Sequence, residues 1–335
     1  MSDPRRILVV RLSALGDVLL ATPAVRALAR RFPDAQIDWL VEEPYLPLVA
    51  TNPHARAVAY RKKGAHSGVG GLLALRRTLA AEGYDLVVDL QDKPKTRLVR
   101  GIAPRCLVWK KRTSAQALFS LVGQEAPLTR AHAVDLYFEA LGPLGIEVDG
   151  RQLDLAVTEE MAVRTARLLP EGPLAGIAPG ARWATKRWGA GCFAKLAGAL
   201  VERGYRPLLL GGPSDESIFA AVRASLPFPV PDAGALDVGG LVAAIARCAV
   251  VVAGDSGPMH VASALGTPVV ALFGPTSTER WRPLSPRSTV VRVELECSPC
   301  SNHGGEVCPL GHHDCMRRLE VEDVLAAVER VTARA

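Results

Sequence analysis

Short runs of four or five apolar residues recur along the chain and alternate with stretches in which apolar residues are spaced three or four positions apart. Such runs are typical of buried strands in a parallel sheet, and the spaced pattern is typical of helices that bury one face. We therefore expect strands at residues 7–10, 37–41, 86–90, 106–109, 174–178, 207–210, 250–253 and 269–273. We expect helices at 18–31, 71–81, 136–141, 158–169, 193–203, 216–225, 241–248, 258–265 and 321–331.

Strands and helices alternate in both halves of the chain, which favours an α/β protein with two doubly wound parallel sheets. A length of 335 residues fits two domains of about 150 residues each. The segment PEGPLAG at 170–176 is rich in proline and glycine, so we place the boundary between 165 and 173. The predicted division is an N-terminal domain at 1–165, a C-terminal domain at 174–317, and a last helix within 318–335 that packs back on the domains.

Composition narrows the class of protein further. Hydrophobic residues make up 49% of the chain and aromatic residues only 5%, so the core is built from leucine, valine and alanine. No run approaches the roughly 18 uncharged apolar residues of a membrane helix, and the start MSDPRR is unlike a signal peptide. We expect a cytoplasmic protein. A net charge of +6 favours anionic partners.

The clearest chemical signal lies between the predicted strand 250–253 and the predicted helix 258–265. Gly254, Asp255, Ser256 and Gly257 form a short loop there, and the first helical N–H groups, up to His260, are placed to bind a phosphate. A carboxylate beside a phosphate repels it unless a hydroxyl group or a cation lies between them. The loop therefore favours a sugar phosphate or a nucleotide sugar as ligand. The alternative is that Asp255 and Ser256 only cap the helix.

Two further loops follow predicted strands. In the first, RLSALGD, Gly16 allows a sharp turn and Asp17 falls near the start of a helix, as a general base or as a helix cap. The loop lacks the G-x-G-x-x-G pattern of dinucleotide sites. In the second, PGARWATKRWGAG, Lys186 is suited to clamp a diphosphate, whereas Arg187 is more typical of a solvated turn.

These residues carry a resemblance that covers nearly the whole chain. The sequence resembles glycosyltransferase family 9, the ADP-heptose:lipopolysaccharide heptosyltransferases. The matching segments are RLSALGDVLLATPAVRAL, DLVVDLQ, PGARWATKRW, GDSGPMHVASALGTPVVALFGPT and CPLGHHDCM. The resemblance implies the GT-B architecture, in which two Rossmann-like domains face each other across a cleft. It places the acceptor on the N-terminal domain and the nucleotide sugar on the C-terminal domain.

The resemblance also implies roles for single residues. Asp17 matches the proposed catalytic base, and Lys186 matches the residue that contacts the donor phosphates. The loop residues surround the diphosphate and the donor sugar: Asp255, Ser256, Gly257 and His260. Asp215 and Glu216 match more loosely, as contacts to the ribose or adenine of the donor. The implied reaction is an inverting single displacement without a catalytic metal or other cofactor.

The acceptor implied by the resemblance is the inner core of lipopolysaccharide, of the Kdo–lipid A type. Arg61, Lys62 and Lys63 form a basic cluster that suits its acidic sugars and lipid phosphates, and a second cluster lies at 110–112. Such a surface would also touch the inner leaflet of the membrane. The alternative for both clusters is solvated surface.

Four cysteines follow the spacing C-x2-C-x7-C-x6-C, at Cys297, Cys300, Cys308 and Cys315. This spacing is compatible with a zinc site or with reduced thiols. A similar segment occurs in heptosyltransferases of the second type, which favours heptosyltransferase II over heptosyltransferase I. A family 9 enzyme with another nucleotide-sugar donor stays an alternative.

Two other classes are disfavoured. An epimerase would need a glycine-rich cofactor loop and a Tyr-x-x-x-Lys pair, which the chain lacks. A nucleic-acid binder fits poorly with so few aromatic residues and with two long α/β halves.

Overall fold

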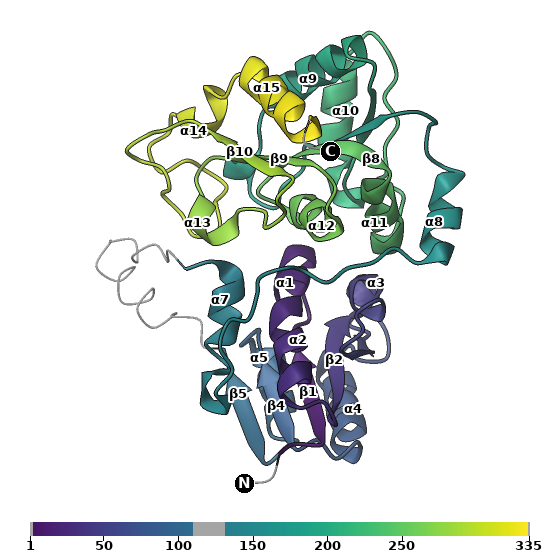
Figure 1. Cartoon of the computed structure of the whole chain (residues 1–335), viewed down its shortest axis with the longest axis vertical. Helices are drawn as coiled ribbons and strands as arrows, with labels where there is room; N and C mark the ends of the chain where they lie inside the picture. The colour runs from purple at the N-terminus through teal and green to yellow at the C-terminus, as the bar shows by residue number, and fades with distance from the viewer. Residues whose placement is uncertain (1–2, 110–130, 334–335) are drawn as a thin grey trace. The chain divides into compact units, whose positions relative to one another are not determined.

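The computed structural model describes residues 3–109 and 131–333, so the basic cluster at 110–112 lies outside the described residues. The chain divides into two compact units. The first unit holds residues 3–109 together with Ala133–Leu155, and the second holds residues from Ala156 to 333 together with residues 131 and 132. Each unit is built around a parallel sheet of five strands, which confirms the predicted fold class (Figure 1).

The sheet of the first unit has the order β3-β2-β1-β4-β5, and all neighbouring strands are parallel. Its strands are β1 (Arg6–Val10), β2 (Gln36–Glu42), β3 (Arg56–Tyr60), β4 (Leu86–Asp89) and β5 (Arg105–Val108). Four of them were predicted. The edge strand β3 was missed because its residues RAVAY begin with an exposed arginine, the next three are only partly buried, and the two alanines make the apolar run weak.

The helices of the first unit are α1 (Leu15–Leu20), α2 (Thr22–Arg31), α3 (Leu46–Ala50), α4 (Gly68–Ala81), α5 (Pro94–Arg100) and α7 (Ala133–Phe138). The prediction of one helix at 18–31 was wrong, because α1 ends before Ala21 and α2 begins at Thr22. Pro23 has no N–H and is tolerated in a first helical turn, so it favours a new helix start at this point.

A buried carboxylate lies on β2. Asp38 accepts hydrogen bonds from Tyr84 Oη at 2.6 Å and from Arg56 Nε and Nη2 at 2.9 and 2.8 Å. Burial acts to raise the pKa of Asp38, but the hydrogen bonds from Arg56, Tyr84 and Gln36 outweigh it, and the pKa is lowered. The network links β2 to the start of β3, through Arg56, and to Tyr84, which precedes β4.

The sheet of the second unit has the order β10-β9-β8-β6-β7 and is also parallel. Its strands are β6 (Leu174–Ala178), β7 (Arg206–Leu209), β8 (Cys248–Gly254), β9 (Val269–Phe273) and β10 (Ser288–Arg292). The edge strand β10 was not predicted, because all five of its residues are only partly buried.

The helices of the second unit cover both faces of this sheet: Figure 1 shows α9 and α15 on one face and α11 and α12 on the other. The helices are α8 (Glu159–Ala166), α9 (Ala190–Glu202), α10 (Glu216–Ala224), α11 (Val238–Ala246), α12 (Gly257–Leu265), α13 (Thr278–Trp281), α14 (Asp314–Arg317) and α15 (Val321–Thr332). Short 3-10 turns lie at Ala184–Lys186 and Pro213–Asp215. No described helix combines the length and the apolar character needed to cross a membrane.

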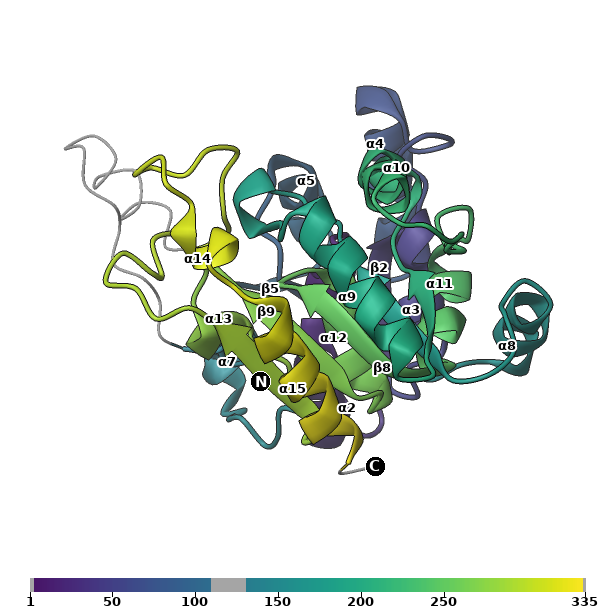
Figure 2. The same cartoon turned by 90° about the horizontal axis from the view of Figure 1, so that it is seen from above.

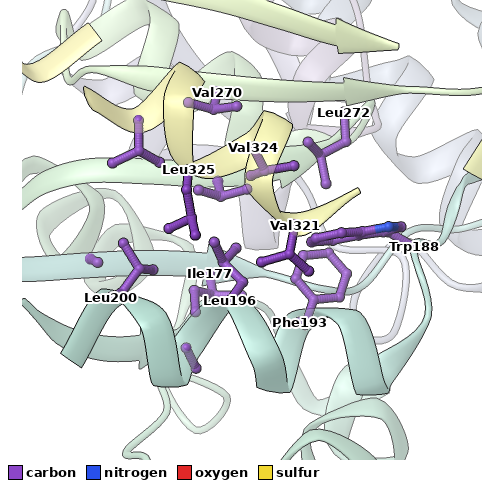
Figure 3. Packing of buried hydrophobic residues seen from close by; sticks show 14 of the residues in the cluster. Ile177, Trp188, Phe193, Leu196, Leu200, Val270, Leu272, Val321, Val324 and Leu325 are labelled. Carbon is purple, nitrogen blue, oxygen red and sulfur yellow. The ribbon is translucent and has the colours of Figure 1, made fainter. Parts of the chain in front are cut away.

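The last helix, α15, is part of the core of the second unit. Figure 2 shows α15 running beside α9, with which it packs. Val321, Val324 and Leu325 of α15 meet Phe193 of α9, and the indole of Trp188 closes the cluster (Figure 3). The Trp188 ring stands edge-on to Phe193 at 5.1 Å, and its Nε1 donates to the carbonyl of Leu319 at 3.0 Å. This packing anchors the chain two residues after Lys186.

Candidate functional site

Three loops meet at the carboxyl ends of β6, β8 and β9, which are neighbours in the second sheet. They carry Lys186, Asp255 and Thr276. Parallel α/β sheets bind their ligands at this edge. The first two loops approach closely at Gly254, where a Cβ atom would lie 3.1 Å from the backbone oxygen of Lys186.

Lys186 and Asp255 form a buried ion pair. The Nζ atom lies 2.6 Å from Oδ2 of Asp255, and only 14% and 5% of the two side chains are exposed. The hydroxyl of Thr276, a residue that was not predicted from the sequence, donates a hydrogen bond to the same oxygen at 2.7 Å. The lysine is therefore a cation beside the carboxylate, which explains how an acidic residue can lie in a loop that is predicted to bind phosphate.

The start of α12 differs in one detail from the expectation. Ser256 occupies the N-cap position, but its Oγ donates to the carbonyl of Gly254 at 3.2 Å and caps no helical N–H. The N–H groups of Gly257 and Met259 have no carbonyl in a preceding helical turn to bind, whereas the N–H of His260, the fourth helical residue, faces the carbonyl of the N-cap residue Ser256. The His260 side chain is buried, with 4% of the residue exposed. The helix start can therefore donate to an anion.

The segment that includes the four cysteines, residues 297–315, folds against the loop of Lys186. Thr185 exchanges backbone and side-chain hydrogen bonds with Gly305 at 2.8–3.0 Å, and its carbonyl lies 2.7 Å from Nε2 of His313. Gly304 has φ of +88°, and a Cβ atom there would come within 2.9 Å of the Lys186 stem. The sequence did not predict that this segment holds Lys186 in place.

The four thiols of this segment differ in their environment. None of the four forms a disulfide within the described residues, and Sγ of Cys297 lies 3.9 Å from Nε2 of His312. Burial and the other three thiols raise the pKa of Cys315 to about 11. Burial acts in the same direction on Cys308, but N–H groups of residues 310–313 donate to its sulfur and lower its pKa. Within residues 3–109 and 131–333, no three His, Cys, Asp or Glu side chains are placed to hold a metal ion.

Asp215 and Glu216 occupy different environments. Asp215 accepts from the N–H of Gly212 at 2.9 Å, and its carboxylate lies so close to Gly180 that a Cβ atom there would clash at 2.2 Å. Glu216 begins α10, is 65% exposed, and lies 3.4 Å from Arg223. The described contacts thus bring Asp215 to the loop after β6 and leave Glu216 apart from Lys186 and Asp255.

Asp17 lies in the first unit, near the carboxyl end of β1. It is the third residue of α1, and its Oδ2 lies 2.8 Å from Nη2 of Arg11, while its Oδ1 accepts from Tyr137 Oη at 3.2 Å. Protein groups therefore hold the Asp17 side chain, and 32% of it remains exposed to solvent.

Arg11 is the buried centre of this arrangement. Its Nη1 donates to the carbonyl of Leu90 at 2.6 Å, and its guanidinium lies over the ring of Tyr137 at 5.2 Å. Burial acts to lower the pKa of Arg11, but Asp17 and Tyr137 outweigh it, and the pKa is raised. Gln91, from the matching DLVVDLQ segment, accepts from the N–H of Leu12 at 2.6 Å and so supports the same loop.

The basic cluster follows β3. Arg61, Lys62 and Lys63 are exposed, and Arg61 Nε pairs with Glu43 at 2.9 Å. The structure therefore places these residues in the first unit with Asp17, in a different loop.

Comparison with known proteins identifies the family. The family model described as "Glycosyltransferase family 9 (heptosyltransferase)" matches residues 72–309. Lipopolysaccharide heptosyltransferase 3 of Escherichia coli K12 is 30% identical over 291 residues, which cover 80% of this chain and 82% of that protein. Lipooligosaccharide heptosyltransferase 2 of Haemophilus influenzae is 29% identical over 309 residues, which cover 86% of this chain and 88% of that protein.

A solved structure agrees with this result. A family 9 glycosyl transferase from Veillonella parvula is 27% identical, superimposes with a TM-score of 0.82, and covers 99% of this chain and 98% of its own. The predicted GT-B fold class and the predicted class of enzyme are thereby confirmed. The chain belongs to glycosyltransferase family 9.

Proposed function

We propose that the protein transfers L-glycero-D-manno-heptose from ADP-heptose to the inner core of lipopolysaccharide. The family and the names of its relatives support heptosyl transfer. The observation that carries the proposal is the buried pair of Lys186 and Asp255 beside the start of α12. It combines a cation and helical N–H groups for a diphosphate with a carboxylate for a sugar hydroxyl.

On this proposal the second unit holds the donor. Lys186 and the N-terminus of α12, from Ser256 to His260, bind the diphosphate and stabilise the charge that develops on ADP as it leaves. The contacts that Lys186 and Thr276 make with Asp255 both use Oδ2, so we assign Oδ1 to a hydroxyl group of the heptose. Glu216 is assigned to the nucleoside. The donor domain corresponds to residues 174–317, and the helix within 318–335 completes its core.

The first unit supplies the base and the acceptor site, in a domain that we place at residues 1–165. Asp17 removes the proton of the acceptor hydroxyl while that oxygen attacks the anomeric carbon opposite the diphosphate, so the configuration inverts. Arg11 and Tyr137 orient the carboxylate. Arg61, Lys62 and Lys63 bind acidic groups of the acceptor, at the inner leaflet of the membrane.

We assign the second heptose as the product. The segment with four cysteines supports heptosyltransferase II, whereas relatives of types 2 and 3 match almost equally well, at 29% and 30% identity. The alternatives are heptosyltransferase I and a family 9 enzyme with another donor.

The test is single-turnover transfer from ADP-heptose to Kdo2-lipid A and to its mono-heptosylated form. We expect product only with the heptosylated acceptor, loss of product in Asp17→Asn, and normal transfer in the matched control Asp34→Asn, an exposed turn residue. Product with Kdo2-lipid A alone would assign heptosyltransferase I. Failure of ADP-heptose to bind the wild type would refute the heptosyl donor.

A further inference from the structure

Helix α4 and the turn before it, residues 61–81, form a surface of unusual composition, which we call the α4 surface. Only Leu75 and Leu79 of the helix are buried. Val69 is 72% exposed and Leu73 is 40% exposed, although both are large apolar residues. Positions 69, 73, 76 and 77 share one face of a helix, so the apolar residues lie beside Arg76 and Arg77.

The charge of the α4 surface has one sign. Residues 61–81 contain five lysine and arginine residues and no aspartate or glutamate. Arg61 pairs with Glu43, and Arg76 donates to the carbonyl of Leu98. In the part of the chain that the structure describes, no salt bridge engages Lys62, Lys63 or Arg77.

We propose that the α4 surface docks on an anionic lipid bilayer, with Val69 and Leu73 in the headgroup region and the cations on lipid phosphates. A folded protein gains little by exposing two apolar side chains, but an interface of lipid headgroups buries them. Clusters of lysine and arginine beside such residues add attraction to anionic lipids. The inference rests on the proposed function, because the proposed acceptor carries lipid chains, and it names the helix that makes the contact.

The experiment measures vesicle binding without donor and without acceptor. Full-length protein is sedimented with vesicles of phosphatidylethanolamine and phosphatidylglycerol, and with vesicles of phosphatidylcholine alone. We expect binding to the anionic vesicles only, weakened by high salt. Arg77→Glu should lower the binding constant by more than fivefold, since each cation near an anionic surface contributes roughly fivefold. The Val69→Ser/Leu73→Ser variant should lower it by about tenfold.

The controls separate docking from folding and from catalysis. Arg318→Glu makes the same charge change at an exposed position in the second unit and should bind vesicles as the wild type does. Each variant should keep its melting temperature and its affinity for ADP. Equal vesicle binding by Arg77→Glu, Val69→Ser/Leu73→Ser and wild type would overturn the inference. Vesicle binding without any heptosyl transfer would refute the proposed function and leave the docking surface intact.

Discussion

Replacing Lys186 by methionine tests how the proposed donor site is built. Methionine keeps most of the apolar stem that packs under Gly304 but removes the charge that faces Asp255. Within the described part of the chain, the variant therefore leaves a carboxylate that is 5% exposed with the hydroxyl of Thr276 as its partner. We expect two separate effects, one on stability and one on the reaction.

The size of the stability effect follows from the geometry of the pair. Over 2.6 Å, at an effective dielectric constant of about 20, the attraction between unit charges is about 6 kcal/mol. Desolvation of both groups offsets much of this attraction, and removal of one partner from a buried pair typically costs 3–5 kcal/mol. Because Lys186 is 14% exposed and water can reach it, we expect a loss near the lower limit, about 3 kcal/mol. The reaction loses a donor to the leaving diphosphate, which typically lowers kcat by about 10² to 10³.

The assay is urea unfolding followed by tryptophan fluorescence, with ADP affinity and single-turnover transfer measured on the same samples. The informative comparison is with Lys186→Met/Asp255→Asn, in which neither side chain of the buried pair carries a charge. We expect the double variant to regain most of the lost stability and none of the lost transfer. If the double variant is no more stable than Lys186→Met, the unpaired carboxylate is not the cause and the reasoning is refuted.

Three further outcomes follow from the structure. Asp17→Asn should lower kcat by about 10² to 10⁴, measured by single-turnover transfer, and should also lower the free energy of unfolding in urea titration, because it removes the charge that pairs with the buried guanidinium of Arg11. Asp38→Asn should lower stability at neutral pH by about 1–3 kcal/mol. The pKa of Asp38 is lowered in the folded state, so its contribution is present above the unfolded pKa of about 3.9 and lost as pH falls through the folded value. The variant should therefore show a flatter acid limb in unfolding experiments, and an unchanged limb would contradict this assignment. Cys308, with its lowered pKa, should react with iodoacetamide at neutral pH faster than Cys315, whose pKa is about 11, and peptide mass spectrometry that found the reverse order would contradict the described sulfur contacts.

Most of the strands that could be predicted are buried along their length; β5 is an exception, because its apolar run at the sheet edge is only partly buried. Continuous apolar runs such as 250–253 and 269–273 have no solvated side, so the sequence alone identifies them as buried strands. The edge strands β3 and β10 are only partly buried, and their mixed residues are no different from those of a loop. The helix at 18–31 was predicted as continuous because the apolar spacing continues through the break before Thr22.

The site was predictable only where its residues lie in short motifs. The loops with Asp17, Lys186 and Asp255 follow predicted strands, so their position at the sheet edge could be inferred. Tyr137 meets Asp17 across 120 residues of sequence, and Thr276 meets Asp255 across 21. Such partners depend on which strands are neighbours, and apolar runs do not encode strand order. The assignments of Glu216 and of the cluster at Arg61 stay predictions.

In each unit a carboxylate pairs with a cation at the carboxyl edge of the sheet. The two carboxylates, Asp17 and Asp255, differ in the exposed fraction of their side chains, and this difference bears on their roles. Asp255 is 5% exposed and shares one oxygen between Lys186 and Thr276, so an acceptor hydroxyl has little access to it. Asp17 is 32% exposed, and its partners Arg11 and Tyr137 hold different oxygens. A general base must receive a proton from a hydroxyl that arrives from solvent. A binding group works best when its position is fixed and water is excluded from it. We therefore infer that Asp17 is the carboxylate that takes the proton and that Asp255 is the one that holds the sugar.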